Sequence, residues 1–192
     1  MIQLVAICGK AGAGKDAVAN EVIAQAPELF KRKVSYTTRK KRPFEVEGTD
    51  YYFVSDKTFF NLLADGHIIE ATDINGDMYG TGKNKLCTHK INVGIFDPDG
   101  LEILVHMQDE IDMLIVYLEV SESVRWIRML KEKRDTTIDE MYKRHLYDKK
   151  AFDGRGTYKG TVTLQNDDNT DASTVAEVIV CIAKKYFEIW HF

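Results

Sequence analysis

A glycine-rich stretch near the start of the chain carries residue types that bind phosphate. It reads CGKAGAGKD over residues 8–16. Glycines let a backbone turn so tightly that several N–H groups converge on one anion, and a following helix adds its own unpaired N–H groups. Lys15 supplies a cation for the outer phosphates of a nucleotide. The predicted loop comprises Gly9, Lys10, Ala11, Gly12, Ala13, Gly14, Lys15, Asp16 and Ala17.

The residues on either side of this loop predict the elements that would hold it. Residues 2–7 are mostly apolar and indicate a buried strand. After the loop, Val18, Val22 and Ile23 recur at helical spacing, and Pro27 ends that pattern. Strand, glycine-rich turn and helix form the context that a phosphate-binding loop requires, although an ordinary tight turn is the competing interpretation.

One position departs from the usual loop pattern. The signature ends in Ser or Thr, whose hydroxyl ligates Mg²⁺, whereas this chain has Asp16. A carboxylate is also a hard oxygen ligand, so we predict that Asp16 contacts the metal directly or through water. Its negative charge beside the phosphates is expected to lower nucleotide affinity when the metal is absent.

The composition favours one compact α/β domain. The chain has 192 residues, a formal charge of −4 and 44% hydrophobic residues, which argues against general disorder and against nonspecific nucleic-acid binding. The three cysteines are scattered, and no apolar run reaches membrane-spanning length. We therefore expect a cytoplasmic protein whose first strand belongs to the core and is no signal peptide, with neither a nucleic-acid nor a membrane partner.

Positive charge is concentrated in one short region, which is either a solvated surface or an anion site. The residues are Lys31, Arg32, Lys33, Arg39, Lys40, Lys41 and Arg42.

Alternating strand and helix patterns predict a parallel sheet with helices on both faces. The expected strands are 2–7, 34–37, 51–54, 67–74, 77–80, 93–96, 113–120 and 162–164. Helices are expected after Ser55, at about 83–90 and 101–107, after Ser121, at 138–152 and near the C-terminus. Asn75-Gly76 predicts a hairpin turn, and Asp97, which ends a buried strand, is expected to face the ligand crevice.

A second constellation identifies a family. Residues 34–55 read VSYTTRKKRPFEVEGTDYYFVS, and the pattern continues through GHIIE at 66–70 and NGDMYGT at 75–81. This run closely resembles the GMP-binding segment of guanylate kinases, with the spacing kept without gaps from Ser35 to Thr81. Together with the phosphate loop, it identifies the chain as a member of that family.

The resemblance implies two groups of acceptor-binding residues. The GMP phosphate would be held by Arg39, Arg42, Tyr51 and Tyr79, with Glu45 orienting the arginines, and guanine would be read by Ser35, Glu70 and Thr81. An arginine fork matches phosphate oxygens in pairs. An ionised Glu70 only accepts hydrogen bonds, so it matches the adjacent N1–H and amine of guanine and rejects adenine. Surface charge and simple aromatic packing are the competing interpretations for the arginines and tyrosines.

The resemblance also implies residues around the transferring phosphoryl group. Arg134 and Arg144 match the lid arginines that close over ATP, and Asn166 matches the adenine-contacting loop. Asp97 matches the second of two family aspartates and is expected to contact Mg²⁺, whereas Ile95 replaces the first. Since that first aspartate helps to bind guanine in the family, its absence is expected to loosen selectivity or affinity.

The implied fold is a three-layer α/β P-loop kinase core with a parallel sheet, formed by residues 1–33, 82–126 and 158–192. It would carry a small, mostly β GMP-binding subdomain at 34–81 and a short helical lid at 127–157. Two departures, Asp16 and Ile95, leave room for a different acceptor.

The implied activity is that of a guanylate kinase, a monomer or homodimer that transfers the γ-phosphoryl group of ATP to GMP or dGMP with Mg²⁺. Its catalytic residues would be Lys15, Arg39, Arg134 and Arg144. One alternative is a nucleoside monophosphate kinase with a different or broader acceptor, and another is a non-catalytic peptide-binding module.

Overall fold

The computed structural model describes residues 1–74, 76–132, 137–152, 158, 160–167 and 170–188. In chain order the elements are β1 (Ile2–Cys8), α1 (Lys15–Gln25), β2 (Phe30–Arg32), β3 (Ser35–Thr37), β4 (Tyr51–Phe53), α2 (Asp56–Ala64), β5 (Ile68–Ile74), β6 (Asp77–Gly82), the 3-10 turn η1 (Lys83–Lys85), β7 (Ile91–Ile95), α3 (Pro98–Val105), β8 (Ile111–Glu119), α4 (Glu122–Glu132), α5 (Ile138–Phe152), β9 (Val162–Gln165) and α6 (Ala172–Tyr186).

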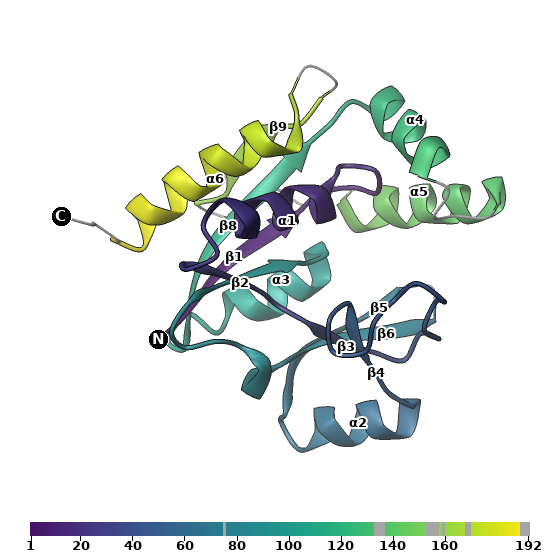
Figure 1. Cartoon of the computed structure of the whole chain (residues 1–192). Helices are drawn as coiled ribbons and strands as arrows, with labels where there is room; N and C mark the ends of the chain where they lie inside the picture. The colour runs from purple at the N-terminus through teal and green to yellow at the C-terminus, as the bar shows by residue number, and fades with distance from the viewer. Residues whose placement is uncertain (75, 133–136, 153–157, 159, 168–169, 189–192) are drawn as a thin grey trace.

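The larger sheet has β1 at its centre. Its order within the described residues is β2-β7-β1-β8-β9, and all neighbouring strands run parallel. Side chains alternate along β1: Val5 and Ile7 enter the cluster with α1 and α6, whereas Leu4 and Ala6 enter the cluster with α3. Figure 1 shows α1 and α6 together on one side of this sheet. The predicted parallel sheet with helices on both faces is confirmed.

A second, mixed sheet follows the order β4-β3-β6-β5. β5 and β6 form the predicted hairpin, in which Gly76 has φ +90° and its N–H donates to Asp73 Oδ1 at 2.7 Å. Ser55 caps α2 as its position suggested, because its hydroxyl accepts a hydrogen bond from the Thr58 N–H. Figure 1 shows this sheet and α2 away from α6.

The structure corrects the helix expected at 83–90. Only η1 forms there, and the chain then turns into β7. The cause lies in Asn92, whose side chain accepts from the Cys87 N–H at 2.8 Å and donates to the Cys87 carbonyl at 2.9 Å. Asn92 thereby takes both backbone groups that a helix through Cys87 would have paired.

Two further expectations were incomplete. β2 was not predicted, although it pairs in parallel with β7 at the edge of the larger sheet. Helix α3 begins at Pro98, ahead of the expected 101, because the Asp97 carboxylate accepts from the Gly100 N–H at 2.8 Å and Pro98 fits the first helical turn. Asp97 therefore caps α3 and lies just beyond the end of β7 at Ile95.

Helix α5 has the predicted bounds of 138–152, and α6 is the expected C-terminal helix. Among the described residues, no helix combines the length and apolar character needed to cross a membrane.

Candidate active site

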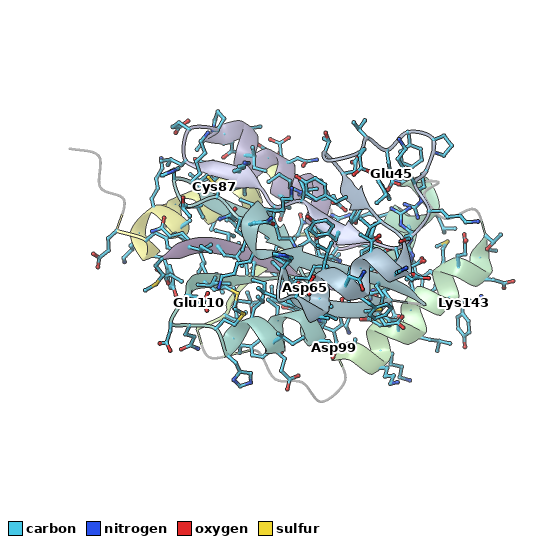
Figure 2. All side chains as sticks on the ribbon, turned by 90° about the horizontal axis from the view of Figure 1, so that it is seen from below. Glu45, Asp65, Cys87, Asp99, Glu110 and Lys143 are labelled. Carbon is cyan, nitrogen blue, oxygen red and sulfur yellow. The ribbon has the colours of Figure 1, made fainter. Side chains whose placement is uncertain are left out.

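One cleft of about 700 Å³ separates the glycine-rich loop from the second sheet. Lys15 lines it from the glycine-rich loop, and Glu70 lines it from strand β5 of the second sheet. Arg39 lines it from the segment that follows β3, and Arg144 lines it from α5. The two predicted anion-binding regions thus face a common space. Figure 2 shows Glu45 and Lys143 toward one end of the molecule, away from Cys87 and Glu110.

The glycine-rich loop has the conformation that its sequence requires. Gly12 and Gly14 adopt φ values of +76° and +80°, and a Cβ on Gly12 would lie 2.6 Å from the carbonyl oxygen of Arg125. Lys15 Nζ donates to the carbonyls of Gly9 at 2.7 Å and Lys10 at 3.1 Å. Burial lowers the pKa of Lys15, while Asp148 opposes that change. The lysine is thus held inside the loop by two backbone carbonyls.

Asn166 has a contact that the sequence did not predict. Its side chain is buried and donates to the carbonyl of Ala13 at 2.8 Å. A Cβ on Gly14 would lie 2.8 Å from the same Asn166 nitrogen. Asn166 therefore stabilises the loop through the Ala13 carbonyl and is not among the residues that line the cleft.

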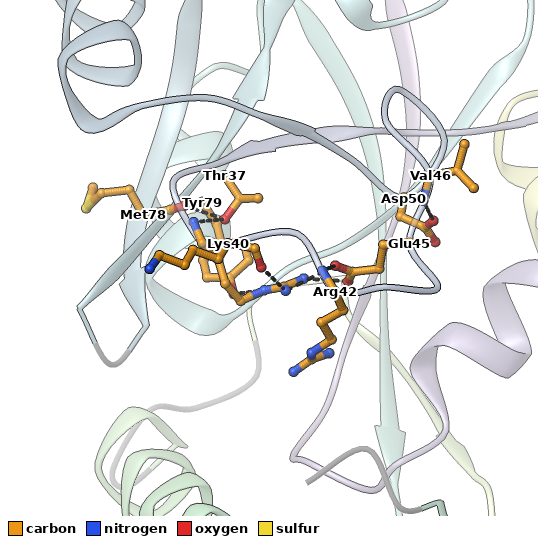
Figure 3. A network of polar contacts seen from close by, with 9 residues as sticks. Thr37, Lys40, Arg42, Glu45, Val46, Asp50, Met78 and Tyr79 are labelled. Atoms are coloured by element: carbon orange, nitrogen blue, oxygen red, sulfur yellow. Dashed lines mark hydrogen bonds and ion pairs between the residues drawn. The ribbon is translucent and has the colours of Figure 1, made fainter. Parts of the chain in front are cut away.

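The predicted phosphate-binding arginine is held by a network of side chains (Figure 3). Arg39 donates from Nη1 and Nη2 to the two oxygens of Glu45, at 3.1 and 2.5 Å, and from Nε to Tyr79 Oη at 3.2 Å. The Arg42 N–H donates to Glu45 at 2.8 Å, and Figure 3 shows the Arg42 guanidinium pointing away from that carboxylate. Tyr51 packs against Arg39, and burial raises the pKa of Tyr51 to about 12.

Of the three predicted guanine readers, Ser35 and Glu70 line the cleft, whereas Thr81 is fully buried and reaches it only through Glu70. Glu70 Oε2 accepts from the Thr81 hydroxyl at 2.6 Å, and Ser35 lines the cleft nearby. Burial raises the pKa of Glu70, whereas the charge of Lys33 and the hydrogen bond from Thr81 oppose the rise. A Cβ on Gly100 would lie 2.6 Å from Glu70 Oε1, so the glycine leaves space for this carboxylate.

The two predicted metal ligands both line the cleft and both already have partners. Asp16 Oδ1 accepts from Arg32 Nη2 at 2.7 Å. Asp97 accepts from the Gly100 N–H through Oδ1 and from Tyr147 Oη, at 2.8 Å, through Oδ2. Among the described residues, no group of three or more His, Cys, Asp or Glu side chains could hold a metal alone. The donor set fits Mg²⁺ that is bound mainly by nucleotide phosphates and water, with one carboxylate such as Asp16.

Helix α5 brings further groups to the cleft. Arg144, one of the two predicted lid arginines, lines the cleft, whereas the other, Arg134, lies outside the described residues. Sequence analysis missed Asp148, whose buried Oδ2 accepts from the Ala11 N–H at 2.7 Å and lies 3.7 Å from Arg125 Nη1. No sequence signal marks Asp148, since it is 137 residues from Ala11. Its carboxylate occupies a loop N–H of the kind that binds phosphate.

Replacing Asp148 with Asn should therefore lower the KM for ATP. The carboxylate competes with phosphate for the Ala11 N–H, and an amide oxygen competes more weakly. Loss of one charge-assisted hydrogen bond predicts a fall of roughly 3- to 10-fold. Initial rates at varied ATP would measure it, with Asp139→Asn, an exposed change on the same helix, as control. A higher KM in Asp148→Asn alone would mean that Asp148 instead maintains the loop.

The family model and the similar sequences all name the same family. The model of the guanylate kinase family matches residues 1–180. A guanylate kinase of Chlamydia felis is 29% identical over 153 residues, which cover 78% of this chain and 75% of the relative. One of Thermotoga maritima is 38% identical over 92 residues, which cover 48% of this chain and 44% of the relative.

Comparison with solved structures supports the same fold. The crystal structure of guanylate kinase from Anaplasma phagocytophilum aligns with a TM-score of 0.65 at 23% identity, over 96% of this chain and 86% of that one. At this identity the likeness concerns the fold, whereas the family model covers nearly the whole sequence. The chain therefore belongs to the guanylate kinase family.

Proposed function

We propose that the protein transfers the γ-phosphoryl group of ATP to GMP or dGMP, giving ADP and GDP or dGDP. Membership of the guanylate kinase family supports GMP as the acceptor. The observation that carries the proposal is the single cleft lined by Lys15, Arg39 and Glu70. It combines a site for donor phosphates, a site for an acceptor phosphate and a carboxylate able to read a base.

The glycine-rich loop would bind the donor. Its N–H groups and the N-terminus of α1 attract the phosphates of ATP, and Lys15 neutralises the outer ones. Mg²⁺, when bound with ATP, would further neutralise the phosphate charge, with Asp16 as the first protein ligand. Asp97 is the weaker candidate for a Mg²⁺ ligand, because its two oxygens already accept hydrogen bonds from the Gly100 N–H and from Tyr147.

The second sheet would bind the acceptor. Arg39 is presented by Glu45 and Tyr79, and Arg42, Tyr51 and Tyr79 line or border the same part of the cleft. A carboxylate that holds a guanidinium by two hydrogen bonds fixes its plane, so phosphate oxygens meet an oriented fork. Ser35, Glu70 and Thr81 would read the base.

Catalysis requires alignment and charge neutralisation, with no covalent intermediate. We propose that Lys15, Arg39 and the α5 residue Arg144 surround the transferred group, with Arg134 as a further predicted lid residue. The segment 34–81 and the lid 127–157 would close over both nucleotides to exclude water, because hydrolysis of ATP is the competing reaction.

The rival functions are less well supported. A non-catalytic peptide-binding module has no need for Lys15 and Arg39 to share a cleft, as they do here. A broader nucleoside monophosphate kinase is suggested by Ile95, which also lines the cleft. Glu70 lines the same cleft, and its carboxylate suits the adjacent N–H groups of guanine, which favours the narrower proposal. The cytoplasmic location and the monomeric or homodimeric state stay predictions.

ADP release with Mg²⁺ across GMP, dGMP, AMP, CMP and UMP tests the proposal. We expect the highest kcat/KM with GMP or dGMP. A clear preference for another monophosphate would support the broader kinase. Absence of both ADP release and ATP binding would support the peptide-binding module. Omitting Mg²⁺ should abolish most of the activity, because the donor phosphates then keep their full negative charge.

A further inference from the structure

Lys33 is a buried cation inside the cleft that sequence analysis did not assign to the site. It follows β2 directly, is 7% exposed and lines the cleft. Its Nζ donates to Thr81 Oγ1 at 2.9 Å and lies 3.9 Å from the centroid of the Phe96 ring. Burying a lysine ammonium costs free energy unless polar or charged partners compensate for the lost water, so such lysines are rare.

The fold gives the Lys33 side chain a defined place. The Lys33 N–H donates to the Val93 carbonyl at 2.9 Å and continues the pairing of β2 with β7. Gly94 leaves room beside it: a Cβ there would lie 2.6 Å from the Phe96 ring and 3.1 Å from Lys33 Cδ. The apolar stem is thus packed between Gly94 and Phe96, and the ammonium is directed to Thr81.

The Thr81 hydroxyl joins Lys33 to Glu70. It accepts from Lys33 Nζ and donates to Glu70 Oε2 at 2.6 Å. An ammonium carries three N–H donors, and Thr81 uses one of them. The pocket therefore presents a donor and an acceptor side by side, held at a fixed spacing by one hydroxyl.

We propose that Lys33 is a specificity-determining residue of the acceptor pocket, which donates a hydrogen bond to the carbonyl oxygen at C6 of guanine while Glu70 accepts from the N–H groups beside it. This assignment rests on the proposed function. Guanine offers an acceptor oxygen at C6 next to a donor N–H at N1. Lys33 would face the oxygen and Glu70 would face the N–H, with Thr81 joining the two side chains. With the acceptor phosphate held by Arg39, adenine would place its C6 amine against the ammonium.

The charge balance of the pocket supports this role. Ile95 lines the cleft without supplying a charge, whereas Lys33 supplies a positive one. Burial lowers the pKa of Lys33 to about 8, with Glu70 and Asp97 raising it and Arg32 lowering it further. Since about 8 is still above neutral pH, the ammonium is mostly protonated at pH 7 and can donate.

The test compares three acceptors with the wild-type protein and with Lys33→Met. GMP has oxygen at C6, 6-thio-GMP has sulfur there and keeps N1–H and the amine, and IMP keeps the oxygen and lacks the amine. We expect the wild type to prefer GMP over 6-thio-GMP by roughly 10-fold in kcat/KM, the worth of one hydrogen bond to a charged group. Lys33→Met should bring this ratio close to one and leave the GMP-to-IMP ratio, set by Glu70, within about 2-fold.

Lys31→Met, an exposed change in β2 two residues before Lys33, is the matched control and should keep both ratios. A wild type that uses GMP and 6-thio-GMP equally would overturn the assignment, even if Lys33→Met fails to fold. An unchanged preference in a folded Lys33→Met variant would overturn it as well. Failure of the proposed function is a separate result, because the wild type would then release no ADP with GMP.

Discussion

Replacing Lys15 with Met is expected to lower kcat for phosphoryl transfer to GMP by roughly 10³-fold. Lys15 is the cation of the glycine-rich loop, and its Nζ already lies among the loop carbonyls of Gly9 and Lys10. In the transition state it would spread charge from the transferred phosphoryl group, a role that the thioether of Met cannot perform. Steady-state ADP release at saturating ATP, GMP and Mg²⁺ would measure the loss.

The expected loss lies in kcat more than in the KM for GMP, because the acceptor phosphate is proposed to bind by Arg39, which lines the cleft from outside the loop. Lys57→Met, a change of the same type at an exposed position on α2, should leave kcat within about 2-fold of wild type and so serves as control. A Lys15→Met protein with nearly full kcat would remove Lys15 from the catalytic machinery.

Replacing Glu70 with Gln should lower kcat/KM for GMP by roughly 10²- to 10⁴-fold and should not lower the activity with AMP in parallel. In the proposed complex the carboxylate would accept from two neighbouring N–H groups of guanine, whereas an amide would turn a donor toward one of them. The buried position makes this mismatch costly, because water cannot replace the lost hydrogen bond. The ratio of kcat/KM values for GMP and AMP, measured on both proteins, is the quantity to compare.

Glu70→Gln also leaves Lys33 without its neighbouring anion, which is expected to lower stability and activity in general. The ratio of kcat/KM values for GMP and AMP corrects for such a general loss, because it affects both substrates. Thermal unfolding of the variant would show the size of that effect. Glu28→Gln, an exposed change between α1 and β2, should preserve both the ratio and the melting temperature. An unaltered preference for guanine in Glu70→Gln would mean that another group reads the base.

Local sequence patterns predicted the elements that neighbours along the chain stabilise. The glycine-rich loop, the hairpin at Gly76, the cap at Ser55 and the bounds of α5 all depend on residues a few positions apart. Such interactions are specified by spacing and residue type, so they can be inferred before the fold is known. The pair formed by Arg39 and Glu45 was expected from the family resemblance, and six residues separate its members.

Where prediction failed, pairing within the larger sheet outweighed a local preference. The segment 83–90 has an ordinary helical composition, but the Asn92 side chain takes the backbone groups of Cys87. β2 is three residues long and contains one fully buried side chain, Phe30, so its sequence carries little periodic signal. It becomes a strand because β7 offers an edge to pair with.

The sequence by itself determined the family, the glycine-rich loop and most of the residues that are proposed to hold the acceptor. Tertiary structure alone decided that Asp148 contacts the Ala11 N–H, that Asp16 pairs with Arg32 and that Asn166 supports the loop. The physical reason is that a motif records residue types at fixed spacing. The position of a buried charge such as Lys33 depends instead on which side chains the folded sheets bring within hydrogen-bonding distance.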